Sequence, residues 1–454
     1  MLRIDALGAG GEYRTRKSEV IASMSGVAVA ELSVVPPLYV SRTMAAQRKV
    51  APLPAPRREE ALSEAAGIFT GGVIAGLDFE SYVRLASRIS GVPIAVTRAG
   101  ARGVAGAVGG AVDAVRPARP RGAALDWRAQ RDRPGGAVWV RRGEVFAVHA
   151  AGNGPGVHGV WPQALALGYR VAVRPSRREP LTAHRLVLAL RQAGFRDEDA
   201  VYLPTDHAGA DEIIRSADFA MVYGGQDVVG KYAGDPAVLV NGPGRAKIVI
   251  TADRDWRDCV DVIVESVAGL GGMACVNATA VLYEGNPAPL AEAIAERLSA
   301  IEPLPADDER AILPTQPLAH ARSLADHLAA RAAGTTALLG ADQVVADLGD
   351  GQAALRPAVH VMTEPDVDKL NVELPFPCVW VSSWSREAGL APLRNSLAIT
   401  AITGDEALID GLLAEPTIGN VYRGHLATWY SAPEVPHDGF LADALMRSKG
   451  FAGN

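Results

Sequence analysis

The sequence has few cysteines, no apolar run of membrane length and no excess of positive charge. Its three cysteines, Cys259, Cys275 and Cys378, are too few and too scattered for a disulfide framework or a cysteine zinc site, so a reducing cytoplasm is the expected location. No apolar run reaches the roughly 18 residues that a membrane-spanning helix needs. The first residues show no apolar core that ends in a small-residue cleavage site, so no secretory signal is expected.

Charge and histidine content exclude two further classes of protein. The formal net charge of -6 argues against a general nucleic-acid binder, which normally carries a basic field. The nine histidines contain no pairing motif such as HExxH, so no metal site is expected. Hydrophobic residues make up 48% of the chain and charged residues 21%, which is the composition of a globular protein.

The length of 454 residues is too great for one ordinary core and predicts two or three domains. Strands and helices alternate from about residue 137, and a second alternating block begins near residue 246, after the NGPGR segment. Such alternation is typical of parallel sheets with crossover helices, so the predicted class is α/β with a boundary near residue 240. The glycine-rich stretch 98–122 resembles a phosphate loop, but no buried strand leads into it, and a closely packed small-residue helix is predicted instead.

Two polar loops follow predicted strands, where ligand sites of such sheets lie. In HAAGNGPG, residues 149–156, Asn153 stands among glycines, which suits either an oxyanion donor or a simple turn. In VRPSRREP, residues 173–180, three arginines gather at a strand end, which suits either phosphate binding or a solvated basic turn.

A glycine pair and a cysteine mark two more candidate positions. Gly224 and Gly225 follow a strand and open a predicted helix, whose N-terminus could receive a pyrophosphate. Cys275 stands between a predicted helix and the strand-like run TAVLY, where it is either a nucleophile or a small buried residue. Cys259 and Cys378 have the spacing of core residues and are predicted to be buried.

These loops occur in the order found in the aldehyde dehydrogenase superfamily, which the chain resembles over about residues 45–445. Five short segments carry the resemblance, and together they favour the nucleophile for Cys275 and the oxyanion donor for Asn153. The segments are Asn153-Gly154-Pro155, Arg174-Pro175-Ser176-Arg177, Tyr223-Gly224-Gly225, Gly272-Met273-Ala274-Cys275 and Glu373-Leu374-Pro375-Phe376-Pro377.

The resemblance implies a Rossmann-like nucleotide-binding domain, a catalytic domain and a small β-arm that joins subunits in a homodimer or homotetramer. The arm would combine residues near 125–148 with the segment GHLATWYSAPEV. The implied divisions are an N-terminal arm, 1–45, a nucleotide-binding domain, 46–240, a catalytic domain, 241–420, and a C-terminal bridging segment, 421–454. The resemblance also implies cofactor binding by Arg174, Ser176, Arg177, Gly224, Gly225 and Glu373, with Glu373 at the ribose.

One departure from the family bears on the reaction. Oxidising members carry a glutamate base, and here that position falls on Val240 or Asn241, neither of which takes a proton from water at neutral pH. This form resembles the branch that exchanges acyl groups with thiols. The loops AGNGP and PHDGF, the latter at residues 436–440, resemble the luciferase-associated fatty-acyl reductase in particular.

The expected reaction is therefore reduction of an acyl thioester to an aldehyde through an acyl-Cys275 intermediate, with CoA or a phosphopantetheine carrier as the thiol. Arg177 replaces a family glutamate that repels a 2′-phosphate, so NADPH is expected over NADH. The alternatives are an aldehyde oxidation that uses Asp227 or Glu265 as a relocated base, and a non-catalytic family member. The charged region 305–334 is predicted to be a solvated helical surface, with a carrier-protein docking site as the alternative.

Overall fold

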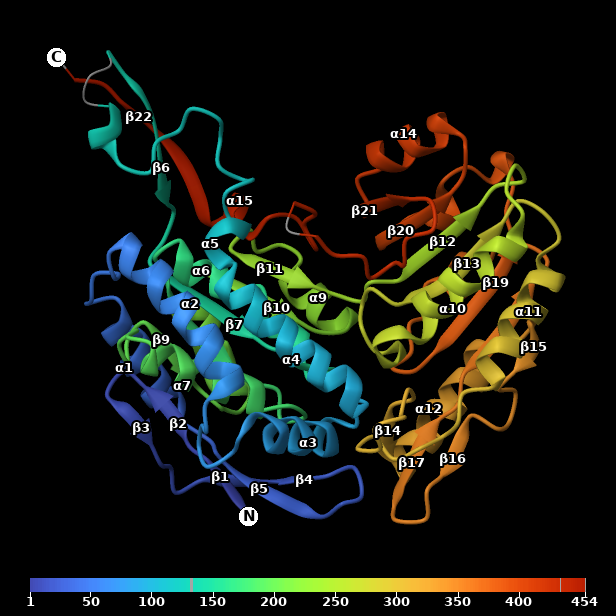
Figure 1. Cartoon of the computed structure of the whole chain (residues 1–454), viewed down its shortest axis with the longest axis horizontal. Coiled ribbons are helices and arrows are strands. Elements are labelled where there is room, and N and C mark those ends of the chain that lie inside the picture. Colours follow the sequence, from blue (N-terminus) through green and yellow to red (C-terminus); the bar gives the residue numbers. More distant parts are fainter. Residues whose placement is uncertain (131–133, 433, 454) are drawn as a thin grey trace.

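The computed structural model describes residues 1–130, 134–432 and 434–453, which form two α/β lobes set side by side (Figure 1). Each lobe is built around one seven-stranded sheet. The predicted α/β class with two mainly parallel sheets is confirmed. Within the described ranges, no helix is both long and apolar enough to cross a membrane.

The sheet of the N-terminal lobe is parallel across five strands and is extended by two short antiparallel ones. Side chains on both faces of the central strands are buried, which explains why their sequences are continuous apolar runs. The strand order is β11 (Val238–Asn241), β10 (Phe219–Tyr223), β7 (Val145–His149), β8 (Arg170–Arg174), β9 (Ala200–Tyr202), β2 (Ala6–Gly8) and β3 (Gly11–Tyr13).

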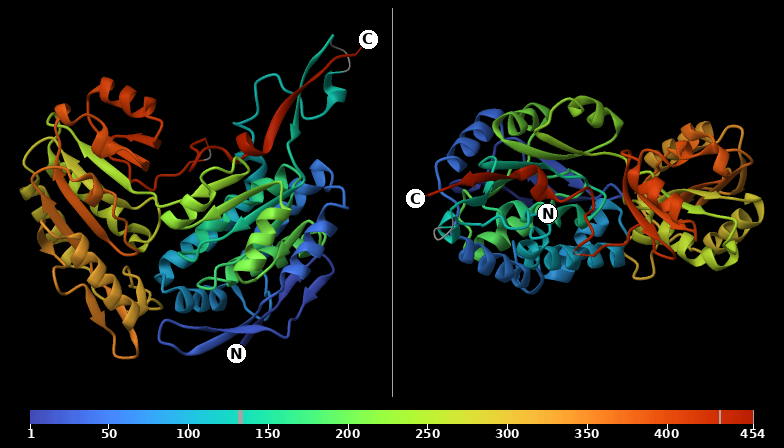
Figure 2. Two further views of the ribbon diagram at one scale, coloured as in Figure 1. Left: turned by 180° about the vertical axis from the view of Figure 1, so that it is seen from behind. Right: turned by 90° about the horizontal axis from the view of Figure 1, so that it is seen from above.

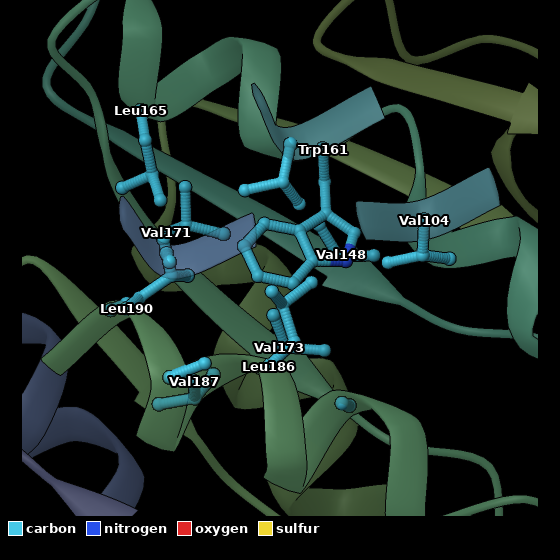
Figure 3. Packing of buried hydrophobic residues seen from close by; sticks show 14 of the residues in the cluster. Val104, Val148, Trp161, Leu165, Val171, Val173, Leu186, Val187 and Leu190 are labelled. Carbon is cyan, nitrogen blue, oxygen red and sulfur yellow. The ribbon is translucent and has the colours of Figure 1, made fainter. Parts of the chain in front are cut away.

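Helices cover both faces of this sheet. Trp161 is fully buried on one face, among Val148 and Val173 of the strands and Leu186 of α7 (Figure 3). The first part of the glycine-rich stretch forms α4, as predicted, and a Cβ at Gly109 would lie 3.4 Å from Ala66 on α2. The helices on this face are α2 (Ala55–Gly71), α3 (Phe79–Ser90), α4 (Ile94–Gly109), α6 (Pro162–Ala166) and α7 (Leu181–Gln192), and those on the other are α1 (Pro37–Gln47) and α8 (His207–Ser216).

Residues 1–45 differ from the predicted arm, because they are built into the N-terminal lobe. Leu7 of β2 pairs with Tyr202 of β9, and both side chains are buried. A separate three-stranded sheet is formed by β1 (Leu2–Ile4), β5 (Ala28–Ser33) and β4 (Ser18–Ala22). These strands are mostly too short to show a clear alternation, so the sequence pattern did not indicate them.

The C-terminal lobe begins where the chain passes from Asn241 of β11 to Ala246 of β12, close to the predicted boundary. Its sheet has the order β15 (Thr336–Leu339), β18 (Ala358–Met362), β19 (Cys378–Ser383), β13 (Ala278–Tyr283), β12 (Ala246–Ile250), β20 (Ser396–Ile402) and β21 (Ile418–Arg423), and only β15 is antiparallel to its neighbour. One face packs on α10 (Val260–Ala268) and α11 (Pro287–Ser299), and the other on α12 (Leu318–Arg331), α13 (Val367–Leu370) and α14 (Glu406–Ala414). A small sheet of β14 (Thr315–Pro317), β17 (Gln352–Leu355) and β16 (Val345–Asp347) lies beside α12, so the region 305–334 is only partly helical.

The C-terminal segment crosses back from β21 to the N-terminal lobe, as Figure 2 shows. It ends in α15 (Leu441–Leu445), whose Leu445 is fully buried, and in β22 (Met446–Phe451). The arm pairs β22 with β6 (Gly136–Arg141), so residues 446–451 take the place predicted for 424–435. Positions 131–133 and 433 of the predicted arm lie outside the described residues. Mainly exposed side chains in β22 left no apolar pattern to indicate a strand.

Candidate active site

Cys275 lies in a tight loop between α10 and β13 and is half-buried. The loop is tight because Leu270, Gly271 and Gly272 all have positive φ angles of 54° to 75°. A Cβ at Gly272 would lie 2.5 Å from the backbone nitrogen of Pro377, so only glycine fits there.

Two further residues hold this loop in place. Asn277 accepts a hydrogen bond from the Ala274 backbone at 2.9 Å and donates to the carbonyls of Ser266 and Gly269. A Cβ at Gly244 would lie 1.7 Å from the Cys275 carbonyl oxygen, so this glycine allows the start of the C-terminal lobe to pass directly behind the cysteine. Asn277 was not predicted from the sequence, since its role depends on backbone groups that the fold brings to it.

Asn153 follows β7 and reaches the same loop from the N-terminal lobe. Its Nδ2 donates to the carbonyl oxygen of Met273 at 3.1 Å, two residues before Cys275. Its Oδ1 is buried without a hydrogen-bond partner. An amide nitrogen carries two hydrogens and Met273 takes one, so a second remains for a ligand. The fold therefore brings together Asn153 and Cys275, which the sequence places far apart.

A histidine that the sequence analysis did not single out lies beside the cysteine. Nε2 of His437 is 3.8 Å from Sγ of Cys275, and Nδ1 of His437 is 3.7 Å from the carboxylate of Asp438. Asn420 of β21 donates to the His437 carbonyl at 2.6 Å and anchors this part of the crossing segment. Burial lowers the pKa of His437, but its interactions with Asp438 and Cys275 outweigh burial and raise that pKa to about 10.

Tyr223 of β10 lies near the pair formed by Cys275 and His437. Burial raises the pKa of the Tyr223 hydroxyl, and the charges of Cys275 and Asp438 raise it further. Asp227 and Glu265, the relocated bases considered from the sequence, are both exposed, and neither forms a hydrogen bond or ion pair with Cys275 in the described part of the chain. The ionisable partner of Cys275 is instead a histidine from the crossing segment.

Glu373 faces the backbone behind the cysteine. Its Oε2 accepts a hydrogen bond from the Arg245 backbone at 2.8 Å, and burial raises the pKa of its carboxyl. Nearby, the buried Lys247 donates to Ser396 at 2.7 Å and to Asn371 at 3.0 Å, and burial lowers the pKa of its amine to about 7. These bonds tie the 244–247 segment, which passes behind Cys275, to Asn371, Glu373 and Ser396.

Five of the six predicted nucleotide-binding residues, all except Glu373, lie in loops at the carboxyl edge of the N-terminal sheet. Arg174 ends β8, and its Nε is buried without a hydrogen-bond partner. Ser176 accepts from the Arg178 backbone at 3.2 Å, and a Cβ at Gly152 would lie 2.4 Å from Ser176 Oγ, so this loop packs on the loop of Asn153. Arg177 forms a bidentate ion pair with Glu19 of β4, which the sequence analysis did not anticipate.

Gly224 and Gly225 lie at the same edge, between β10 and the seven-residue helix α9 (Gln226–Tyr232). Because β10, β7 and β8 are neighbours in the sheet, the loops of Gly224, Asn153 and Arg174 end side by side. The space at the Cα of Gly225 is open.

The sequence profile of the aldehyde dehydrogenase family matches residues 149–440, which include the loops of Asn153, Arg174, Cys275 and His437. The chain belongs to this family. At this level it is an oxidoreductase, and the predicted superfamily is confirmed, whereas the acyl-CoA reductase branch is a finer statement than the match supports.

Solved structures of aldehyde dehydrogenases share the whole fold. A 3,6-anhydro-L-galactose dehydrogenase, in complex with NAP, superposes with a TM-score of 0.81 at 18% identity and full coverage of both chains. An indole-3-acetaldehyde dehydrogenase of P. syringae, in complex with NAD+ and IAA, has a TM-score of 0.83 at 16% identity and covers 100% of this chain and 97% of its own. The gamma-glutamyl-gamma-aminobutyraldehyde dehydrogenase of Burkholderia cenocepacia has a TM-score of 0.83 at 16% identity, with 99% and 96% covered. At these identities the likeness establishes the fold.

Proposed function

We propose that this aldehyde dehydrogenase family member oxidises an aldehyde to a carboxylic acid through a thioester on Cys275, with His437 as its base. The observation that carries the proposal is the contact of Cys275 Sγ with His437 Nε2 at 3.8 Å, with Asp438 behind the imidazole. The sequence favoured acyl-thioester reduction because no carboxylate base was found near residue 240. The contact of His437 with Cys275 supplies a base, and the structural relatives named above are aldehyde dehydrogenases.

In the first half of the reaction, His437 keeps its proton and places a positive charge beside the sulfur of Cys275. The thiolate is the nucleophilic form, and a cationic neighbour favours it. Attack on the aldehyde carbon turns the carbonyl oxygen into an oxyanion, which the free N–H of Asn153 would stabilise. For this adduct to become the thioester on Cys275 it must lose a hydride, whose acceptor a bound nicotinamide dinucleotide would supply.

In the second half of the reaction, the same histidine acts as a base. Once Cys275 carries the acyl group, its negative charge is gone, and so is one of the two partners that raise the pKa of His437. The imidazole then releases its proton more readily and can accept one from water. The hydroxide attacks the thioester carbon, the C–S bond breaks, and the acid leaves with the Cys275 thiolate restored.

The residues at the carboxyl edge fit a nicotinamide dinucleotide, which supplies the hydride acceptor when bound. The buried, unpartnered Nε of Arg174 and the open space at Gly225 are what an anionic ligand lying on a strand end requires. Arg174, Ser176, Arg177, Gly224, Gly225 and Glu373 are the residues proposed to hold it.

A second candidate, reduction of an acyl thioester with CoA or phosphopantetheine as the thiol, is favoured by the residues at the family's base position. Val240 and Asn241 occupy β11, and neither side chain is a base. Both candidates pass through the same acyl-Cys275, so they differ in whether water or a thiol exchanges with it.

A steady-state assay separates the two. Purified protein is mixed with NAD+ or NADP+ and a panel of aldehydes, with and without CoA or pantetheine, and the nicotinamide absorbance is followed. We expect turnover without any thiol. Turnover only when a thiol is present would select the second candidate, and absence of turnover under all conditions would contradict both.

Replacement of Asn153 by alanine tests the oxyanion role. Loss of one oxyanion donor is expected to lower kcat by about 10²–10³-fold. Because the same change removes the bond to Met273, alkylation of Cys275 by iodoacetamide is measured in parallel. An unchanged alkylation rate with a lowered kcat supports the role, whereas an unchanged kcat contradicts it.

A further inference from the structure

The rim beside Arg174 carries two ion pairs that join the N-terminal strands to the nucleotide-binding edge. Arg177 binds Glu19 through Nε and Nη2, both at 2.8 Å. Lys17, just before β4, binds Asp206 at the start of α8 at 2.9 Å. Each pair is neutral, whereas Arg174 beside them has a buried Nε without a hydrogen-bond partner among the described residues.

The ion pair with Glu19 changes how Arg177 would interact with a 2′-phosphate. An isolated arginine after this strand would attract a 2′-phosphate, which is the basis of the NADPH expectation. In this structure the Arg177 guanidinium already binds the Glu19 carboxylate through two nitrogens. That carboxylate would repel a phosphate dianion placed next to it. The pair is only partly shielded, with exposed fractions of 54% for Arg177 and 28% for Glu19, so a ligand can reach both groups.

We propose that Glu19 selects between the two nicotinamide dinucleotides by occupying Arg177 and offering its own carboxylate to the ribose. A ribose 2′-hydroxyl can donate a hydrogen bond to this carboxylate, whereas a 2′-phosphate cannot. The wild-type rim therefore favours NAD(H). Removal of the Glu19 charge frees Arg177 to bind the 2′-phosphate of NADP(H). This inference rests on the proposed function, because it requires a dinucleotide at the carboxyl edge.

The test measures binding without turnover. Dissociation constants of 5′-ADP and 2′,5′-ADP are determined by calorimetry for the wild type and for Glu19→Gln. We expect Glu19→Gln to bind 2′,5′-ADP roughly tenfold more tightly, since a like charge is removed beside the phosphate, and to bind 5′-ADP somewhat less tightly, since the 2′-hydroxyl then donates to a neutral amide oxygen. Glu19→Gln with Arg177→Gln should lose the gain.

Glu12→Gln is the matched control, because it removes the same charge from the exposed edge strand β3 of the same lobe. It should leave both constants unchanged. If both nucleotides bind but Glu19→Gln does not alter their ratio, the inference about Glu19 is wrong and the proposed function stands. If neither nucleotide binds any of the proteins, the inference and the proposed function both fail.

Discussion

Replacing His437 by glutamine is expected to lower kcat for aldehyde oxidation by about 10²–10⁴-fold, the contribution typical of a general base. Glutamine keeps a polar side chain of similar reach but can neither hold the imidazolium charge beside Cys275 nor accept a proton from water. The loss should therefore fall on both halves of the reaction. Rapid mixing with NAD+ and aldehyde, followed by nicotinamide absorbance, resolves which half limits the variant.

Two outcomes of that experiment distinguish the roles of His437. A burst of one reduced nicotinamide per enzyme, followed by slow turnover, would mean that the thioester forms and water attack is impaired. A slow reaction without a burst would mean that thiolate formation limits. The control is His425→Gln, which removes a histidine of the same crossing segment, 4.0 Å from Cys259. A kcat for His437→Gln equal to that of this control would refute the proposed base.

The second large effect concerns acid stability. His149, His158 and His184 are buried, and burial lowers their pKa values from 6.5 to about 3, about 3 and about 4. The unfolded chain takes up protons at these residues below pH 6.5, whereas the folded chain does not until about pH 4. Each histidine thus stabilises the fold above pH 6.5, and this stabilisation falls by about 1.4 kcal/mol per pH unit as the pH drops from 6.5 to 4.

Together the three histidines would lower the free energy of unfolding by about 4 kcal/mol for each pH unit of acidification. Burial raises the pKa of Glu179, so this carboxyl offsets part of that loss. Urea denaturation between pH 6 and pH 4.5 measures the slope. His184→Gln on α7 should reduce it by about 1.4 kcal/mol per pH unit. His327→Gln on α12, at an exposed position, is the control and should leave it unchanged. Equal slopes in the two variants would show that His184 is not buried in its neutral form.

The central strands of both lobes could be predicted from the sequence alone. They are buried on both faces and are therefore mainly apolar, as in β7, β8, β12, β13 and β19. The short strands of residues 1–45 and the exposed β22 could not be found in this way. They are held by pairing with distant strands rather than by an apolar pattern of their own.

The active site also has features that the sequence predicts and features that only the tertiary structure shows. The loops of Asn153 and Arg174 follow neighbouring parallel strands, whose carboxyl ends lie at one edge of the N-terminal sheet, and the loop of Cys275 precedes β13 of the other sheet. The sequence by itself determined these candidates and the α/β class. Only the tertiary structure decided the partners of these residues. His437 reaches Cys275 because the C-terminal segment crosses between the lobes, and Glu19 reaches Arg177 because β4 folds beside the nucleotide-binding edge. Such contacts join residues far apart in the chain, and no local spacing or composition encodes them.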